Sequence, residues 1–260
     1  MDKRFNCTEC GNCCSKIRGK LSEEETEFLK ENAYGKMPLF QLISIEESSF
    51  PLWDWEAKRF KAWADEVGVD AKIRPLRAMF DLDSNKTIII AYHMDSDSCP
   101  FLSDKKCLIY DKKRAFVCRL FPFQRTPFLD IDEESDPSKL LGYCHVTNEV
   151  LDEIPRNNFE MVKWFNEYFS DGSFLNAVQN DISIAWTNKM IMELCKGEVI
   201  RPAINYPYDK LMKRVSNSVS VDFMDYLIEK KIKTKEEIET LIKRFDDNRD
   251  AVDKIKEFLG

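Results

Sequence analysis

Eight of the nine cysteines lie before residue 150, and the first four have the spacing of metal ligands. The N-terminal run reads Cys7-Thr8-Glu9-Cys10-Gly11-Asn12-Cys13-Cys14. Its two successive C-x2-C steps turn the backbone tightly enough to aim three thiolates, those of Cys7, Cys10 and Cys13, at one inorganic centre. Gly11 favours such a turn because glycine adopts left-handed backbone angles at little cost. The run therefore predicts a metal or cluster bound by thiolates.

Cys13 and Cys14 are adjacent, and adjacent side chains tend to diverge, especially in extended backbone. We therefore expect one of them to serve a second site, as the fourth cysteine of bacterial ferredoxin runs binds the other cluster. Four later cysteines could supply further ligands: Cys99, Cys107, Cys118 and Cys144. Two four-coordinate sites would use all eight thiolates, with Cys14 joining some of the later group. One cluster plus structural or reactive thiols would use the same residues.

The ligand pattern favours iron–sulfur chemistry over zinc. Zinc ribbons commonly pair two C-x2-C knuckles around one ion, whereas the first three of the later cysteines are separated by seven and ten residues. Iron–sulfur clusters accept remote thiolates from irregular loops, and the chain has only two histidines. We predict one or two iron–sulfur clusters of the [4Fe-4S] type, with zinc as the alternative. Disulfides are disfavoured because the sequence is long and carries no signal peptide.

Arg119 follows Cys118 and is the best candidate for a cation that offsets the negative charge of a cysteine cluster. It belongs to a stretch rich in cations. That stretch could also be a solvated basic face or a docking surface for an acidic protein. Its other cations are Lys105, Lys106, Lys112, Lys113, Arg114 and Arg125.

The remaining residues with ligand chemistry are expected to be structural. A lone histidine is more often hydrogen-bonded than bound to a metal, so we interpret His93 and His145 as structural, although His145 could replace a thiolate. Cys195 lies on the apolar side of a predicted helix and should behave as a small buried hydrophobe. The acidic residues 130–136 are expected to form an exposed loop.

The cysteine-bearing segments resemble the CxxCxxCC family of zinc- or iron-chelating domains. The resemblance rests on the C-x2-C-x2-C-C run and on three later motifs, which are CPFL at Cys99, CLIY at Cys107 and CRLFP at Cys118. It spans residues 7–144 and implies a cysteine-cluster domain that holds iron–sulfur or another chelated metal. Ala115 stands where the family pattern has proline, which leaves the ligands intact. The same domain occurs in flagellin lysine-N-methylases, so the resemblance also implies a cluster-dependent lysine methylase as an alternative function.

The elements that must position the first cysteines are mixed in type. A capping box at Ser22-Glu23-Glu24-Glu25 predicts a helix that Gly35 would close. A second helix is predicted from about Trp53 to Val67, ending before Gly68. Its core stripe would be Trp53, Phe60, Trp63 and Val67.

A hairpin should deliver the chain to Cys99. Residues 79–82 and 87–93 have strand character and flank the polar turn at residues 83–86. Between Cys99 and Cys144 few periodic runs occur, which predicts irregular backbone that a metal could order.

After Pro155 the pattern becomes helical. Four segments carry apolar residues at helical spacing, namely residues 159–169, 174–196, 221–230 and 234–259. Residues 234–237 form a capping box for the last, and residues 171–173 separate the first two. The chain is therefore predicted to be α+β and mainly α. An irregular cysteine-rich unit with a small β-hairpin would occupy residues 1–150, and a helical unit residues 151–260. The two units could form a single domain.

Composition and missing motifs exclude several functions. The formal net charge of -7 disfavours nucleic acid and anionic membrane as partners, and no apolar run is long enough to span a bilayer. The sequence has no G-x-G-x-x-G, P-loop, G-x-S-x-G or H-E-x-x-H motif, which removes ordinary nucleotide-binding, hydrolase and zincin functions. We expect a cytoplasmic protein that transfers electrons or supports a redox reaction with a redox or substrate protein. A zinc-stabilised interaction module is a further alternative, and the sequence leaves open whether the protein is an enzyme.

Single cysteine substitutions should separate ligands from structural thiols. Cys10→Ser is expected to lose metal and to destabilise the fold, because metal binding and folding are coupled. Cys195→Ser should leave the metal content unchanged. Metal analysis of both purified variants tests this division, and equal metal loss from the two would contradict it.

Overall fold

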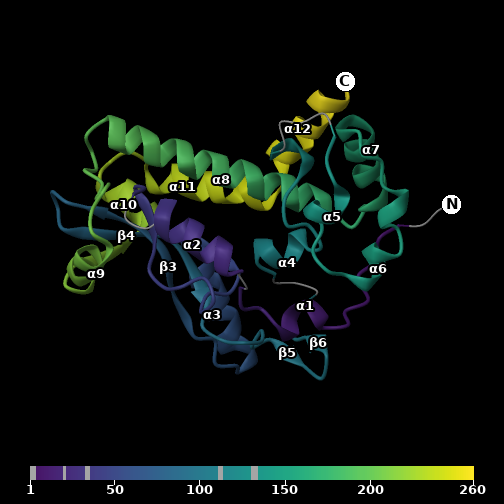
Figure 1. The fold of residues 1–260 in the computed structure, drawn as a ribbon, viewed down its shortest axis with the longest axis horizontal. Helices are drawn as coiled ribbons and strands as arrows, with labels where there is room; N and C mark the ends of the chain where they lie inside the picture. The colour runs from purple at the N-terminus through teal and green to yellow at the C-terminus, as the bar shows by residue number, and fades with distance from the viewer. Residues whose placement is uncertain (1–3, 20–21, 33–35, 111–113, 130–133) are drawn as a thin grey trace. The chain divides into compact units, whose positions relative to one another are not determined.

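The computed structural model describes residues 4–19, 22–32, 36–110, 114–129 and 134–260, without the side chains of Glu25 and Lys30. The structure is α+β with helices predominating, as predicted (Figure 1). It contains two compact units, each assembled from separated parts of the chain. The first unit comprises Met1–Cys13, Asp104–Asn188 and Glu239–Gly260, and the second comprises Cys14–Ser103 and Lys189–Ile238. Residues 151–260 contribute to both units, and a domain boundary at residue 150 stays a prediction.

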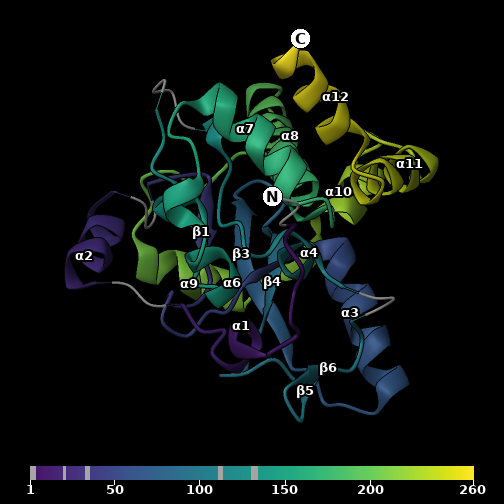
Figure 2. The same ribbon diagram turned by 90° about the vertical axis from the view of Figure 1, so that its right-hand side faces the viewer.

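The second unit is built on a sheet whose longest strands are the predicted hairpin, β3 (Ile73–Asp81) and β4 (Lys86–Met94). Strand β1 (Leu39–Gln41) pairs with β3, and β2 (Pro51–Trp53) pairs with β4, both antiparallel. Figure 2 shows β1, β3 and β4 side by side. The hairpin turn is fixed by the Asp81 carboxylate, which accepts hydrogen bonds from the backbone N–H groups of residues 83 and 84.

Helix α3 (Asp54–Val67) confirms the second predicted helix and its end at Gly68, whose φ of 72° is left-handed. Its predicted core stripe was partly wrong. Phe60 is buried and meets the ring of Phe101 edge-on at 4.7 Å, but Val67 is 36% exposed. The buried face instead continues through Ala64, which is 2% exposed.

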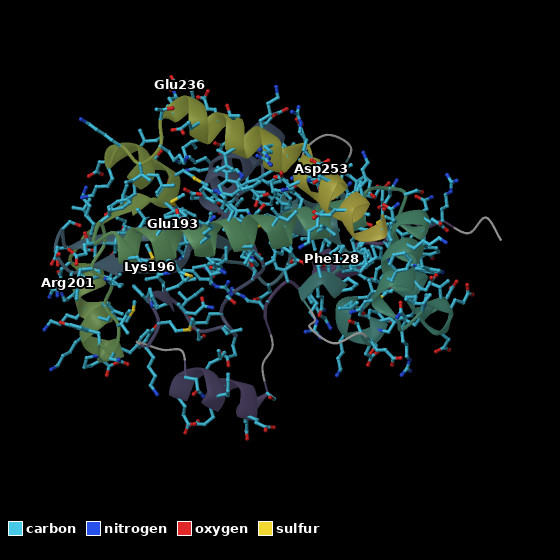
Figure 3. All side chains as sticks on the ribbon, turned by 90° about the horizontal axis from the view of Figure 1, so that it is seen from above. Phe128, Glu193, Lys196, Arg201, Glu236 and Asp253 are labelled. Carbon is cyan, nitrogen blue, oxygen red and sulfur yellow. The ribbon has the colours of Figure 1, made fainter. Side chains whose placement is uncertain are left out.

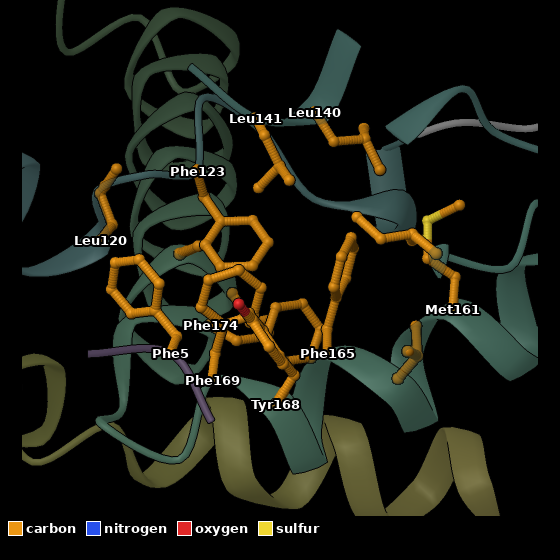
Figure 4. Close-up of a cluster of buried hydrophobic side chains, with 14 of the residues drawn as sticks. Phe5, Leu120, Phe123, Leu140, Leu141, Met161, Phe165, Tyr168, Phe169 and Phe174 are labelled. Carbon is orange, nitrogen blue, oxygen red and sulfur yellow. The ribbon is translucent and has the colours of Figure 1, made fainter. Parts of the chain in front are cut away.

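The first unit has an aromatic core around Phe123. Helices α7 (Asn158–Tyr168) and α8 (Ser173–Lys196) confirm two predicted helices, with the Asp171 carboxylate accepting a hydrogen bond from the Ser173 N–H between them. The ring of Phe123 lies 4.6 to 5.3 Å from those of Phe165, Phe169 and Phe174 (Figure 4). These edge and tilted contacts add to the free energy of burying each ring.

Short elements fill the segment between Cys99 and Cys144, so the predicted irregular backbone is confirmed. They are β5 (Leu102–Ser103), β6 (Lys106–Cys107), α4 (Phe116–Leu120), the 3-10 turn η1 (Pro127–Leu129) and α5 (Pro137–Leu140). Of the acidic segment, residues 130–133 lie outside the described residues. Asp136 is exposed and caps α5 by accepting a hydrogen bond from the Ser138 N–H over 3.0 Å. Beyond Cys144 come α6 (His145–Asn148) and the 3-10 turn η2 (Leu151–Glu153).

The last part of the chain departs from the prediction in two places. Residues 221 and 222 do not begin a helix but end β7 (Val219–Asp222), which pairs parallel with β4, and α10 (Phe223–Glu229) follows. The helix predicted over 234–259 is divided into α11 (Lys235–Asp246) and α12 (Arg249–Leu259), because Asn248 has a left-handed φ of 54°. The predicted capping box is confirmed, since Thr234 Oγ1 accepts from the Glu237 N–H over 3.2 Å.

Three helices complete the described chain. Helix α1 (Asn12–Ser15) is a single turn, α2 (Glu23–Asn32) begins where its capping box predicted, and α9 (Tyr208–Ser216) was not predicted. The predicted end of α2 at Gly35 lies outside the described residues. No helix in the described ranges is both long and apolar enough to cross a membrane.

A buried carboxylate joins α3 to α10 in the second unit. Asp54 is 2% exposed and accepts a hydrogen bond from the Met224 N–H over 2.8 Å. Burial raises the pKa of Asp54 to about 7, since the Met224 hydrogen bond only partly offsets the loss of water and the charge of Asp222 adds to the rise.

The unfolding free energy is expected to fall as the pH rises from about 4 to about 7 and to level off above that range. Between these pH values the folded protein holds a proton on Asp54 that the unfolded chain has released. The total loss of unfolding free energy over this range is at most about 4 kcal/mol. Asp54→Asn should remove this decline. Urea unfolding on both sides of the range measures it, and identical pH slopes for the two proteins would contradict the assignment.

Candidate metal centre

The segment that carries the first three cysteines is anchored in the first unit by Phe5. The Phe5 N–H donates to the carbonyl of Tyr168 over 2.8 Å, and its buried ring lies 5.0 Å from that of Phe169. Gly11 has a φ of 74°, which confirms the predicted left-handed turn. Glu9 also has a positive φ, 52°, so the backbone winds tightly between the cysteines.

Tyr110 links this segment to the CLIY motif. Its hydroxyl is hydrogen-bonded to the Cys7 thiol, and its backbone N–H donates to the Cys107 carbonyl over 3.4 Å. Burial, together with the hydrogen bond and charge of Cys7, raises the pKa of Tyr110 to about 12 against the opposing charge of Arg114. The hydroxyl therefore keeps its proton at neutral pH and is the donor to Cys7.

Cys107 lies among charges that belong to the same segment. Burial raises the pKa of its thiol, and the negative charges of Glu9 and Cys13 act in the same direction. The Ile109 N–H and the Arg114 guanidinium act against them. The thiols of Cys13 and Cys107 are thus close enough to influence each other, although they are 94 positions apart in the sequence.

Cys144 lies at the edge of the aromatic core, as Cys7 does, and both pack against it. Its carbonyl accepts a hydrogen bond from the Asn148 N–H over 2.9 Å in α6. The neighbouring His145 lies with Nε2 3.4 Å from Thr8 Oγ1, so its ring adjoins the N-terminal run. This contact supports the interpretation of His145 as a hydrogen-bonded residue.

Cys10 and Cys118 complete the cysteines of the first unit, and both are half-buried. Cys118 lies within α4. In the described part of the chain, no three cysteine, histidine, aspartate or glutamate side chains are gathered closely enough to grip an ion as they stand.

The second unit holds the remaining pair, Cys14 and Cys99. The Cys99 N–H donates to the Cys14 carbonyl over 2.8 Å, and the Ile17 N–H donates to the Asp97 carbonyl over 3.0 Å. Arg18 strengthens this pairing, because its guanidinium lies 3.0 Å from the carboxylates of both Asp95 and Asp97. The segment after Cys14 is thereby held against the segment that leads to Cys99.

Cys13 and Cys14 are assigned to different units, although both lie in the single turn of α1. Successive side chains of a helix point about 100° apart around its axis. This divergence agrees with the expectation that the two thiols serve different sites, and which site each serves stays a prediction.

Arg119, the predicted cation beside the cysteines, contacts an aromatic ring and a carboxylate, and its role at the metal site stays a prediction. Its guanidinium lies 4.3 Å from the ring centre of Phe116, and its Nη2 lies 3.4 Å from the Asp246 carboxylate. Arg114 instead lies 4.4 Å over the ring of Tyr110. Lys112 and Lys113 of the same basic stretch lie outside the described residues.

The remaining predicted structural residues are His93 and Cys195. His93 is buried, its Nδ1 accepts from the Ser49 N–H over 3.4 Å, and burial lowers its pKa. Cys195 is half-buried in α8, and Glu193 and Lys196 of the same helix are exposed (Figure 3). Both lie in the second unit.

Sequence comparison assigns the cysteine region to a known family. A sequence model matches residues 6–145, which is more than half of the chain. The chain belongs to the CxxCxxCC family. This family is described as a "Putative zinc- or iron-chelating domain", and the match includes all eight candidate ligands. No curated protein and no solved structure matches the chain in the same comparisons.

The donor set fits the metals of the CxxCxxCC description. All nine cysteines lie in the described ranges, and none of them forms a disulfide. Thiolates are ligands of iron–sulfur clusters and of structural zinc alike. The residues that could hold a metal in the first unit are Cys7, Cys10, Cys13, Cys107, Cys118 and Cys144, and in the second unit Cys14 and Cys99.

Thiol labelling should distinguish these environments in metal-free protein. Cys13 is exposed and should react with iodoacetamide several times faster than Cys99, which is 7% exposed and fixed by its hydrogen bond to Cys14. Mass spectrometry of timed samples measures the two rates. Labelling of Cys99 as fast as that of Cys13 would mean that the pairing does not hold in solution.

Proposed function

We propose that this protein binds an iron–sulfur cluster through cysteines of the first unit and transfers electrons or supports a redox reaction. The observation that carries the proposal is the match of residues 6–145 to the CxxCxxCC family, which takes in all eight candidate thiols. Iron–sulfur clusters are held by thiolates from irregular backbone of this kind.

The spacing of the N-terminal run favours a cluster of the [4Fe-4S] type, because its two C-x2-C steps resemble the start of bacterial ferredoxin motifs. Such a cluster needs four cysteines, and the first unit offers six. The N-terminal run would contribute Cys7, Cys10 and Cys13, and one of the later cysteines would complete the set. A second cluster, which the count of eight candidate cysteines allows, stays a prediction.

Each group of residues has a separate task in this function. The bound cluster would supply the capacity to accept and release single electrons. The thiols bind it, the Phe5 anchor orients the segment that carries three of them, and the aromatic core against Cys7 and Cys144 limits the access of water. A redox or substrate protein would be the partner, and a net charge of -7 argues against nucleic acid and membrane.

The proposal implies a cytoplasmic location, because the cytosol keeps thiols reduced and available as ligands. Zinc is the other metal of the family description and would make the same thiols a structural site. The lysine methylase alternative rests on the resemblance alone, and it stays a prediction.

The test is the composition of protein purified without oxygen. We expect iron with acid-labile sulfide and an absorption band that dithionite bleaches, because thiolate-bound clusters accept electrons. Cys107→Ser should reduce the iron content, while Cys195→Ser serves as the matched control and should retain it. Stoichiometric zinc without sulfide would overturn the iron–sulfur proposal and establish a structural zinc module.

A further inference from the structure

We infer that Tyr110 and Arg114 are positioning residues of the metal site, with Tyr110 donating a hydrogen bond to the Cys7 thiolate and Arg114 holding a positive charge behind the tyrosine ring. The inference rests on the proposed function, because it requires a metal or cluster bound by Cys7. It names two residues that would set the reduction potential and metal retention of the site, in addition to the cysteines that bind the metal.

The tyrosine is tied to two candidate ligands at once. Its hydroxyl reaches Cys7, in the N-terminal run, and its backbone N–H reaches the Cys107 carbonyl over 3.4 Å. Both contacts lie in the first unit. Tyr110 therefore sets where the Cys7 sulfur lies relative to the turn that carries Cys107.

Arg114 supplies the compensating charge. Its guanidinium carbon lies 4.4 Å from the centre of the Tyr110 ring, within the range of a cation–π interaction. The positive charge also acts on Cys107, and so it opposes the accumulation of negative charge from Cys7, Cys13 and Glu9. A guanidinium keeps this charge at every physiological pH.

Comparison with Arg119 explains why the role belongs to Arg114. The two guanidinium groups lie at nearly equal distances from an aromatic ring, 4.3 Å for Arg119 over Phe116 and 4.4 Å for Arg114 over Tyr110. Arg119 also pairs with the Asp246 carboxylate, which offsets its charge, and the phenylalanine beneath it has no hydroxyl to donate. Of these two aromatic residues, Tyr110 under Arg114 is the one whose hydroxyl makes a hydrogen bond to a cysteine.

The expected effect follows from the chemistry of thiolate ligands. A hydrogen bond to a ligating sulfur withdraws electron density from it, which stabilises the reduced cluster and raises the reduction potential. The same bond orients the ligand, and loss of such a partner typically weakens metal binding by about tenfold or more. Arg114 should add to the first effect through its charge.

The test uses the full-length protein reconstituted with ferrous iron and sulfide. Tyr110→Phe keeps the ring and its contact with Arg114 but removes the donor. We expect its midpoint potential to become more negative, and the chelator concentration that removes half of the metal to fall about tenfold. Tyr143→Phe is the matched control, because it removes a hydroxyl next to Cys144 from a side chain that is 77% exposed. It should leave both values unchanged.

Arginine variants provide a second measurement. Arg114→Gln is expected to shift the potential in the same direction as Tyr110→Phe, and Arg119→Gln to leave it unchanged. A Tyr110→Phe protein with wild-type potential and chelator resistance would overturn the inference while leaving the iron–sulfur proposal intact. A shift from Arg119→Gln without one from Arg114→Gln would also overturn it.

The two proposals fail in different ways. If the wild-type protein takes up zinc and no cluster, the iron–sulfur proposal fails, and the chelator measurement on cobalt-loaded protein still decides the role of Tyr110. A tenfold loss of cobalt retention in Tyr110→Phe would then support the inference, and equal retention would overturn it. A wild-type protein that holds no metal under either condition would overturn both.

Discussion

The candidate metal centre depends on a backbone hydrogen bond between residues far apart in the chain, from the Phe5 N–H to the Tyr168 carbonyl. An isolated run of cysteines has no fixed path, and ordering each residue costs about 1 to 2 kcal/mol of backbone entropy. Burial of the Phe5 ring against Phe169 offsets part of this cost. The start of the cysteine run is thereby fixed in the first unit, and the rest of the site is built around it.

Charge is the second constraint, and it decides which residues can surround the thiols. Cys13 and Glu9 both act to keep Cys107 protonated, so a metal that binds these thiols must displace protons against their combined charge. Arg114 is the cation placed to oppose them, and the sequence named it only as one of several cations around Arg119. The position next to Cys118 made Arg119 the better candidate, but a guanidinium acts where its long side chain ends. That point depends on tertiary contacts which no local pattern records.

The sequence predicted the long elements well because periodicity and caps are local properties. Helix α3 ends at Gly68 as predicted, and Thr234 caps the start of α11. Strand β7 was missed because its partner β4 lies about 130 positions earlier, and the apolar residues at 221–228 suit a helix when read alone. The break at Asn248 depends on one left-handed residue, which asparagine permits but does not require. The cysteine positions were evident from the sequence, whereas their division between two interleaved units was not.

The separation between Phe5 and Tyr168 also has a consequence for biosynthesis. Ribosomes add about 5 to 20 residues per second, so roughly 8 to 33 s pass between the synthesis of these two residues. For that time the first four thiols belong to a nascent chain whose anchor does not yet exist. They must be kept reduced while the anchor is made, and the centre can be assembled only after synthesis has passed Tyr168. The yield of metal-loaded protein should therefore depend on the thiol-reducing capacity of the cell during translation as well as on its supply of metal.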